Sequence, residues 1–188
     1  MKRLLLLFLL FHISACAPWI QGRGLYQSPT HTFTVNIPQD WMRLKANKHL
    51  LMSRDGPFLQ YILVQQRPIN RPFKHTKKKI QRGMLPQEAA GVILDEMSSD
   101  RAVFNLSVIG NSPATVDGHE GFRIVFTYRS SEGLEFKTIY YGLIIGETFY
   151  SIRYNAAERH YFQKELETFQ QVLASFAITE AKVAGEAG

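Results

Sequence analysis

The sequence predicts an α+β fold in which helices pack on the faces of an antiparallel sheet. Strand-like segments form two groups along the chain, one amphipathic helix separates the groups, and a second helix follows the last strand. Residues that favour tight turns separate neighbouring segments, so hairpins are expected. Two helices in these positions fit a sheet whose faces they cover.

The first group of strands lies in the N-terminal third of the chain. Residues 32–37 alternate between apolar and polar side chains, and Pro38 ends the segment. The apolar positions are Phe33, Val35 and Ile37. Two further strands are predicted over residues 49–53 and 58–66, with a turn at residues 54–57 between them. We expect these strands to form an antiparallel meander.

An amphipathic helix is predicted after the first group, over residues 87–97. Pro86 precedes it, and proline is favoured in the first turn of a helix. Its apolar stripe consists of Ala89, Ala90, Ile93, Leu94 and Met97. This stripe should face the sheet.

The second group of strands is predicted over residues 104–109, 114–116, 121–128, 134–145 and 148–154. Turn signals separate them at residues 117–118, 131–133 and 146–147. The last helix is predicted over about residues 157–176. Its apolar residues recur at steps of three and four, which makes a continuous seam of Phe162, Leu166, Phe169, Leu173 and Phe176.

Residues 1–16 have the pattern of an export signal. Lys2 and Arg3 precede an apolar run over residues 4–13, and small residues follow the run. The run is too short to span a bilayer, which takes ~20 residues. Residues 13–16, Ile-Ser-Ala-Cys, resemble the lipobox of bacterial lipoproteins, which implies cleavage before Cys16 and fatty acyl chains such as palmitate on that residue. The alternative is an ordinary secretory signal.

The residue after the cysteine concerns the destination of the protein. Ala17 stands where many lipoproteins retained in the inner membrane carry aspartate, so the resemblance implies the periplasmic face of the outer membrane, with the inner membrane as the alternative. The sequence thus predicts a signal peptide over residues 1–15, a tether over residues 16–28, one globular domain over residues 29–178 and a disordered tail over residues 179–188.

Several phrases in the globular part are similar to the PsbP-like α/β/α sandwich. They are FTVNIPQDW at residues 33–41, ATVDGHEGFRIVFTY at 114–128, FYSIRYNA at 149–156 and VLASF at 172–176. The resemblance spans about residues 30–178. The family includes the extrinsic PsbP subunit of photosystem II, a Ran-binding nuclear transport factor and many bacterial lipoproteins. The resemblance implies the fold, and no binding residue of the family is carried over.

Motifs for enzyme chemistry are missing from the sequence. It has no glycine-rich phosphate loop, nucleophile elbow or His-Glu-x-x-His helix, and its single cysteine excludes thiol pairs and zinc-thiolate sites. The histidines of the globular part are scattered: His31, His49, His75, His119 and His160. His119 and Glu120 are adjacent, but neighbours in an extended segment point to opposite faces. We therefore expect no catalytic residues, no metal and no cofactor.

A run of cations lies between the first group of strands and the first helix. It consists of Arg67, Arg71, Lys74, Lys77, Lys78, Lys79 and Arg82, without an acidic residue among them. This run exceeds the net charge of +6, so the rest of the chain is net acidic. One interpretation is a flexible loop that contacts anionic lipid, lipopolysaccharide or an acidic protein. The other interpretation is a solvated connection. Nucleic acid is not expected as a partner of an exported protein.

Aromatic residues are frequent in the later strands: Tyr128, Phe136, Tyr140, Tyr141, Phe149, Tyr150 and Tyr154. Packing under the helices is the favoured role, and a ligand groove is the alternative. The sequence therefore predicts a lipid-anchored envelope protein that acts as a non-enzymatic interaction or assembly module. The alternative is a small-molecule or lipid-binding carrier with a pocket between sheet and helix.

Overall fold

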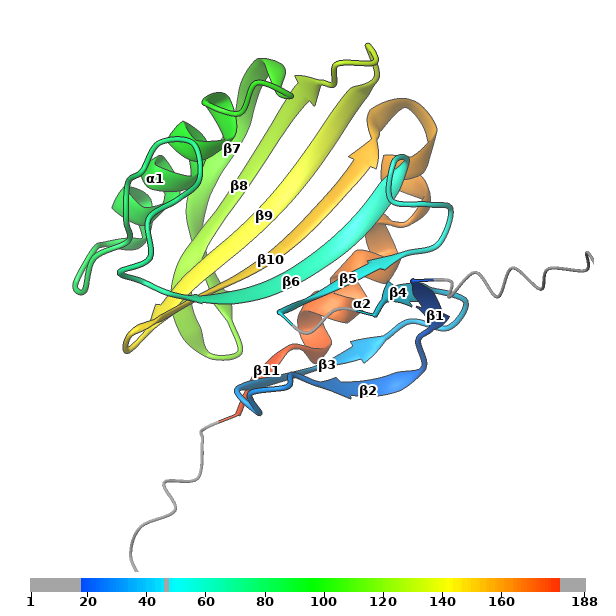
Figure 1. Cartoon of the computed structure of the whole chain (residues 1–188), viewed down its shortest axis with the longest axis horizontal. Coiled ribbons are helices and arrows are strands. Elements are labelled where there is room, and N and C mark those ends of the chain that lie inside the picture. The colour runs from blue at the N-terminus through cyan, green and yellow to red at the C-terminus, as the bar shows by residue number, and fades with distance from the viewer. Residues whose placement is uncertain (1–17, 46–47, 180–188) are drawn as a thin grey trace, which may run out of the picture.

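The large sheet has eight antiparallel strands, as the computed structural model shows for the residues that it describes, 18–45 and 48–179 (Figure 1). Their order across the sheet is β1-β4-β5-β6-β10-β9-β8-β7. The bounds are β1 Trp19–Gln21, β4 Met42–Leu44, β5 His49–Ser53, β6 Gln60–Pro68, β7 Phe104–Val116, β8 His119–Arg129, β9 Glu135–Ile145 and β10 Thr148–Ala157. The predicted antiparallel sheet is therefore confirmed.

A small sheet joins both ends of the described chain. It contains β2 (Gly24–Gln27), β3 (Phe33–Ile37) and β11 (Ala177–Ile178) in the order β11-β3-β2. The alternating apolar residues of β3 are buried as predicted. The expected meander is correct only for β5 and β6, because β3 pairs with β2 and β11 outside the large sheet, and β4, which was not predicted, pairs with β5 instead.

The tether predicted over residues 16–28 is wrong for residues 19–27. β1 pairs with β4, and β2 pairs with β3. Gly22, between them, donates from its backbone N to the carbonyl of Trp41 over 3.0 Å. A Cβ on Gly22 would lie 2.5 Å from Ile37, so the close approach requires glycine. Strands of three or four residues are too short to show an alternating pattern in their own sequence. They are stabilised by pairing with strands elsewhere in the chain. Cys16 lies outside the described residues.

The first helix covers one face of the large sheet. α1 spans Pro86–Ser98, in agreement with the prediction, and Ala89, Ala90 and Ile93 on its stripe are buried. The Glu88 side chain accepts from the backbone N of Leu85 over 2.8 Å at the start of the helix. α1 packs mainly on β7 and β8 (Figure 1). Ile69, Phe73 and Ile80, from the connection between β6 and α1, join the same core.

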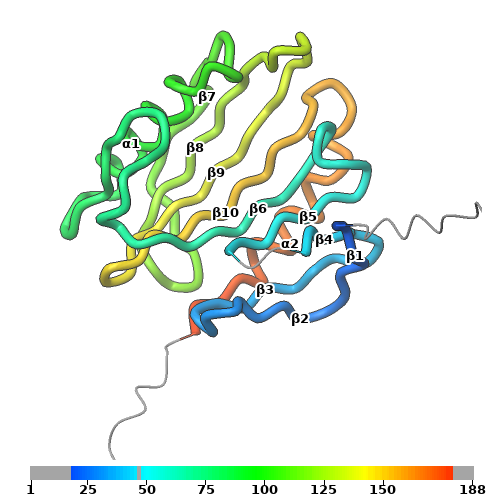
Figure 2. Tube along the Cα trace, viewed as in Figure 1, coloured from blue at the N-terminus to red at the C-terminus, as the bar shows by residue number. Residues whose placement is uncertain are grey.

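The second helix and the small sheet cover the other face. α2 spans Leu166–Ser175, and Phe169 and Phe176 of the predicted seam are buried against Tyr154 and Phe33. The predicted start near residue 157 agrees with the structure to within one residue, but the first turn is π-helical. β10 continues to Ala157 because residues 155–157 pair with β9, and a π-helical turn, η1 (Glu158–Phe162), leads on toward α2 (Figure 2).

The prediction of two strands over residues 104–109 and 114–116 is also corrected. They are one strand, β7, whose register to β8 shifts between Val108 and Gly110. Pro113 lies within β7, which an edge strand tolerates. Among the described residues no helix is both long enough and apolar enough to cross a membrane.

Candidate functional site

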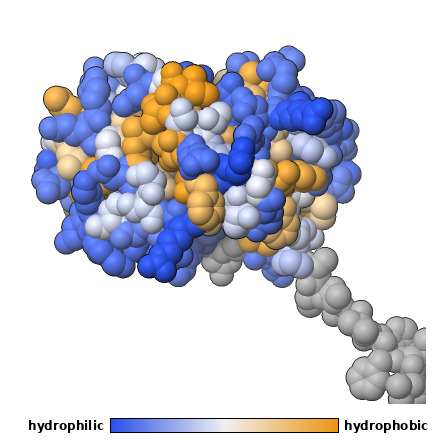
Figure 3. Space-filling model, turned by 90° about the horizontal axis from the view of Figure 1, so that it is seen from above, coloured by the Kyte–Doolittle hydropathy of each residue, from blue (hydrophilic) through white to orange (hydrophobic). Residues whose placement is uncertain are grey.

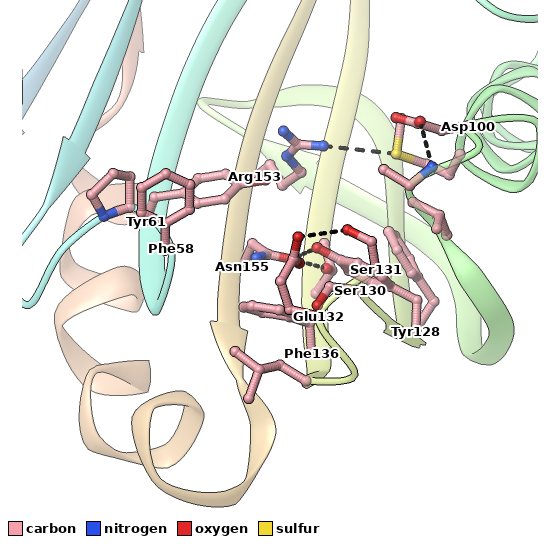
Figure 4. A pocket seen from close by; sticks show the side chains of 17 residues that line it. Phe58, Tyr61, Asp100, Tyr128, Ser130, Ser131, Glu132, Phe136, Arg153 and Asn155 are labelled. Carbon is pink, nitrogen blue, oxygen red and sulfur yellow. Dashed lines mark hydrogen bonds between the residues drawn. The ribbon is translucent and has the colours of Figure 1, made fainter.

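A cleft of about 580 Å³ opens on the α1 face of the large sheet, beyond the C-terminal end of α1. The residues that line it include Phe58 from the β5–β6 turn and Tyr61 from the start of β6. Tyr128 and Phe136 line it from the β8–β9 hairpin, and Arg153 from β10 (Figure 4). Seen from above, hydrophobic side chains gather between hydrophilic ones on the surface of the molecule (Figure 3). This volume is within the range of small-molecule sites, about 300–1,000 Å³.

The cleft exists because α1 covers only part of its face. The helix contacts β7, β8 and β9 and ends at Ser98. Side chains alternate along a strand, so Arg153 and Asn155 of β10 both face the side of α1. Their cross-strand neighbours on β6 are Leu63 and Tyr61. These strands thus present polar and aromatic side chains where no helix lies over them.

Arg153 lies at one side of the cleft between a ring and a sulfur atom. Its guanidinium carbon is 5.1 Å from the centre of the Tyr61 ring, and Nη1 is 3.7 Å from the sulfur of Met97. Its Nε is buried and has no hydrogen-bond partner within the described part of the chain. In Figure 4, Phe58 and Tyr61 lie on one side of Arg153 and Asp100 on the other.

Asn155 organises the deeper part of the cleft. Its Oδ1 accepts hydrogen bonds from Tyr128 Oη over 3.1 Å and from Thr138 Oγ1 over 2.7 Å. Burial raises the pKa of Tyr128 to about 12, so this phenol stays protonated and donates at neutral pH. The Tyr128 ring stacks on Phe136 at 5.4 Å. These contacts hold the aromatic wall in one orientation.

The carboxylates of the cleft have partners outside its aromatic wall. Asp100 lies 3.5 Å from His75, outside the aromatic wall, and Glu132 accepts from Ser131 over 2.7 Å in an exposed turn. The residues with described positions contain no group of three side chains suited to hold a metal ion. The arrangement supports binding by shape, aromatic contact and one positive charge.

The predicted basic run is packed onto the fold at several points. The Arg67 guanidinium lies over the Phe73 ring at 3.8 Å and donates to the carbonyl of Pro72 over 3.0 Å. Lys78 pairs with Asp95 of α1, and Arg82 with Glu147 of the β9–β10 turn. These three cations are therefore bound to the protein itself.

The other cations of the run, Arg71, Lys74, Lys77 and Lys79, are exposed. Lys74 and Lys77 line an open hollow that borders the cleft and shares Asp100 and Ala102 with it. Lys78 and Arg82 are exposed as well, so what distinguishes the other four cations, here called the exposed part of the run, is that they form no ion pair within the described residues. The contacts of the run do not indicate a flexible loop.

His119 and Glu120 lie far from this cleft, in a smaller hollow near the start of α1. No hydrogen bond or ion pair within the described residues joins them into a catalytic arrangement. Of the aromatic residues singled out from the sequence, Phe136, Tyr140, Phe149, Tyr150 and Tyr154 are buried. Tyr128 and Phe136 also line the cleft, so both packing and a groove account for this set.

Sequence reasoning missed Arg153, Asn155 and Tyr61. A signal for the first two was present: they interrupt the apolar strand FYSIRYNA at alternate positions and so share one face of the sheet. Nothing in the sequence placed Tyr61 beside them, because the pairing of β6 with β10 joins segments far apart in the chain.

Comparison with protein-family models and with curated proteins finds no match. Solved structures do match. A protein of Bacteroides thetaiotaomicron has a TM-score of 0.52 at 12% identity over 89% of this chain, which spans about half (51%) of that chain. Cyanobacterial PsbP (CyanoP) from Synechocystis has a TM-score of 0.58 at 12% identity, covering 85% of this chain and 94% of its own.

Two other matches come from different settings. LpqN, involved in cell envelope biogenesis of Mycobacterium tuberculosis, has a TM-score of 0.57 at 12% identity, covering 86% of this chain and 91% of its own. The Saccharomyces cerevisiae Ran-binding protein Mog1p has a TM-score of 0.55 at 8% identity, covering 85% and 96%. At such identities the likeness concerns the fold alone. This chain therefore has the PsbP-like fold that its sequence resembles.

Proposed function

We propose that this protein is a non-enzymatic binding module of the cell envelope, held at the membrane by a lipid on Cys16, with the cleft as its binding site. The cleft itself carries this proposal. Its walls are mainly aromatic and apolar, and Asn155, Tyr128 and Thr138 hold one another by hydrogen bonds. Groups used in this way shape a site and leave no general base beside a nucleophile.

The location rests on two kinds of support. The first is the resemblance of residues 13–16 to a lipobox. The second is the fold shared with LpqN, a protein involved in cell envelope biogenesis. We place the anchor at the periplasmic face of the outer membrane because Ala17 follows Cys16, and the inner membrane is the alternative.

A carrier of small molecules or lipids is the second candidate. The observation that favours it is the position of the cleft, between the sheet and the end of α1, and its volume of about 580 Å³. A module for protein assembly and a carrier would use the same cleft and would differ in what occupies it.

Site-specific photo-crosslinking in cells that make the protein tests this proposal. A photoreactive amino acid replaces Phe58, whose side chain is 87% exposed at the cleft. The matched control replaces Leu25 of β2, which is 68% exposed and does not line the cleft. We expect a discrete adduct from position 58 and none of the same mass from position 25.

The mass of the adduct separates a protein partner from a small molecule. Its identification by mass spectrometry then names the occupant. No adduct from position 58, or the same adducts from both positions, would contradict the assignment of the cleft as the binding site.

A further inference from the structure

An arginine without a counter-ion lies in the cleft. Among the described residues that line it, Arg153 is the only cation, and no described carboxylate lies within 4.0 Å of its guanidinium. Its buried Nε lacks a partner, and Met97 sulfur is a weak acceptor for Nη1. A buried donor without a partner is costly, and a carboxylate that accepts from the guanidinium would reduce that cost.

We propose that the cleft binds an amphiphilic carboxylate of the fatty-acid class, with its carboxylate on Arg153. This inference rests on the proposed function, because it takes the cleft to be the binding site. The planar guanidinium matches the two oxygens of a carboxylate. Tyr61 and Met97 contact opposite parts of the guanidinium group and hold it in place for such a pair.

The two carboxylates around the cleft disfavour a doubly charged ligand. Asp100 and Glu132 also line it, so a dianion such as a phosphate monoester would meet more repulsion than a carboxylate. The negative charge of these two residues also disfavours deep entry of anions that lack an apolar body, since only contact with the walls would offset the repulsion.

The walls account for the apolar part of the ligand. Phe58 is 87% exposed, although it stands over a cleft whose opposite wall is the stacked pair Tyr128 and Phe136. An alkyl chain between these rings would cover Phe58 and remove apolar surface from water. The ligand class thus combines one charge, matched by Arg153, with a chain of moderate length, matched by the aromatic walls.

The test uses the full chain in lipid nanodiscs and decanoate labelled with carbon-13 at its carboxyl group. Binding to Arg153 should give a carboxyl resonance distinct from that of decanoate in the lipid. Decanol and decyl phosphate serve as competitors. We expect decanoate to bind at least about 10-fold more tightly than decanol, because decanol lacks the charged hydrogen-bonded pair. Decyl phosphate should also bind more weakly than decanoate, because Asp100 and Glu132 repel its second charge.

Two variants of Arg153 and one control variant test the role of its charge. Arg153→Met should weaken decanoate about 10- to 100-fold and leave decanol unchanged, because only the ion pair is lost. Arg123→Met is the matched control: Arg123 is also a half-buried strand arginine, it lies outside the cleft, and its loss should change nothing. Arg153→Lys keeps the positive charge but lacks the planar guanidinium that can donate two hydrogen bonds to a carboxylate, so it should give an intermediate loss of decanoate affinity.

The wild-type selectivity is decisive even if a variant fails to fold. No protein-dependent resonance, or equal affinity for decanoate and decanol, would overturn the inference, as would equal losses in Arg153→Met and Arg123→Met. If position 58 gives crosslinks but decanoate does not bind, the proposed ligand class is wrong, whereas the proposal of a binding module is still supported. The absence of both would remove the proposed function as well.

Discussion

At the scale of single residues, buried polar side chains join segments that are distant in sequence. Glu96 of α1 is 5% exposed and accepts from the backbone N–H groups of His75 and Thr76 at 2.9–3.1 Å. Glu165, before α2, is 1% exposed and pairs with Arg54 of the β5–β6 turn over 2.9 Å. Arg153 differs, because its partner is missing within the described chain. The paired groups support the fold, whereas the unpaired Nε of Arg153 lies in the cleft.

Glu96→Gln tests the first of these contacts. Burial alone would raise the pKa of Glu96, but the hydrogen bonds from Thr76 and His75 outweigh it and hold the pKa below its ordinary value of 4.5. The amide would oppose N–H donors, so we expect the free energy of unfolding at pH 7 to fall by about 2–4 kcal/mol. Denaturant titration measures it, with the exposed Glu120→Gln as the control, expected to change by less than about 0.5 kcal/mol.

The pH dependence has a definite sign. Because the pKa of Glu96 is lower in the folded protein than in the unfolded chain, its ionised carboxylate stabilises the folded state above pH 4.5. This stabilisation is lost as the pH falls through the pKa of the folded state. Wild type should therefore lose more stability below pH 4.5 than Glu96→Gln does. Parallel acid profiles of the two proteins would show that this carboxylate is not linked to folding.

At the scale of elements, α2 depends on its buried seam. Phe169 is 1% exposed, and its ring stacks on Tyr154 at 5.2 Å. Phe169→Ala should lower the free energy of unfolding by about 3–5 kcal/mol, because a large cavity would remain. Urea denaturation measures the loss, and the exposed neighbour Gln170→Ala is the control. An unchanged midpoint would contradict burial of the seam.

The exposed part of the basic run is a separate element to test. We predict that the released chain, residues 17–188, binds vesicles that contain acidic lipid or lipopolysaccharide through Lys74, Lys77 and Lys79. At about 1 kcal/mol per lysine, their reversal to glutamate should weaken binding roughly 100-fold or more. Binding of the wild type should also fade as salt shortens the Debye length from ~10 Å at 0.1 M to ~3 Å at 1 M.

The control for this experiment changes the same charge elsewhere. Arg23, Lys45 and Lys48 are also exposed, and their reversal to glutamate should leave binding largely intact. Lys78 is left unchanged because it pairs with Asp95. Equal binding to neutral and acidic vesicles would contradict this prediction and would favour the interpretation of the run as a solvated connection.

At the scale of the whole molecule, the N-terminal strands belong to the domain. A chain that begins at Ser28 lacks β1 and β2, including the half-buried Tyr26, whose ring packs on Phe33 at 6.2 Å. We expect its free energy of unfolding to be lower by about 2–4 kcal/mol than that of a chain that begins at Ala17. Thermal and denaturant unfolding of both chains measures it. Equal free energies of unfolding would mean that the two strands do not contribute to the stability of the domain.

The anchor concerns the whole protein as well. We predict that Cys16 carries the lipid, so that labelling with a fatty-acid probe marks the wild type. Cys16→Ser should give an unlabelled, uncleaved precursor, detected by its greater mass on a gel. A variant that still takes up the probe would end the lipoprotein interpretation.

Prediction from sequence succeeded where the pattern is local. The helix over residues 86–98, the buried face of β3 and the seam of α2 all follow from periodicities within one segment. It failed at β1 and β2, whose pairing partners are distant. It also did not predict that the last helix begins with the π-helical turn η1, which directly follows the paired residues of β10.

By itself the sequence determined both helices, most of the long strands, their apolar faces, and the resemblance of the chain to a PsbP-like protein, because these properties depend on neighbouring residues. Only the tertiary structure decided that Tyr61, Tyr128 and Arg153 meet in one cleft. They come from three strands, and antiparallel pairing, together with the length of α1, sets which strands lie side by side and which part of their face stays open. The cost of an arginine without a counter-ion likewise exists only once packing has removed water from its Nε.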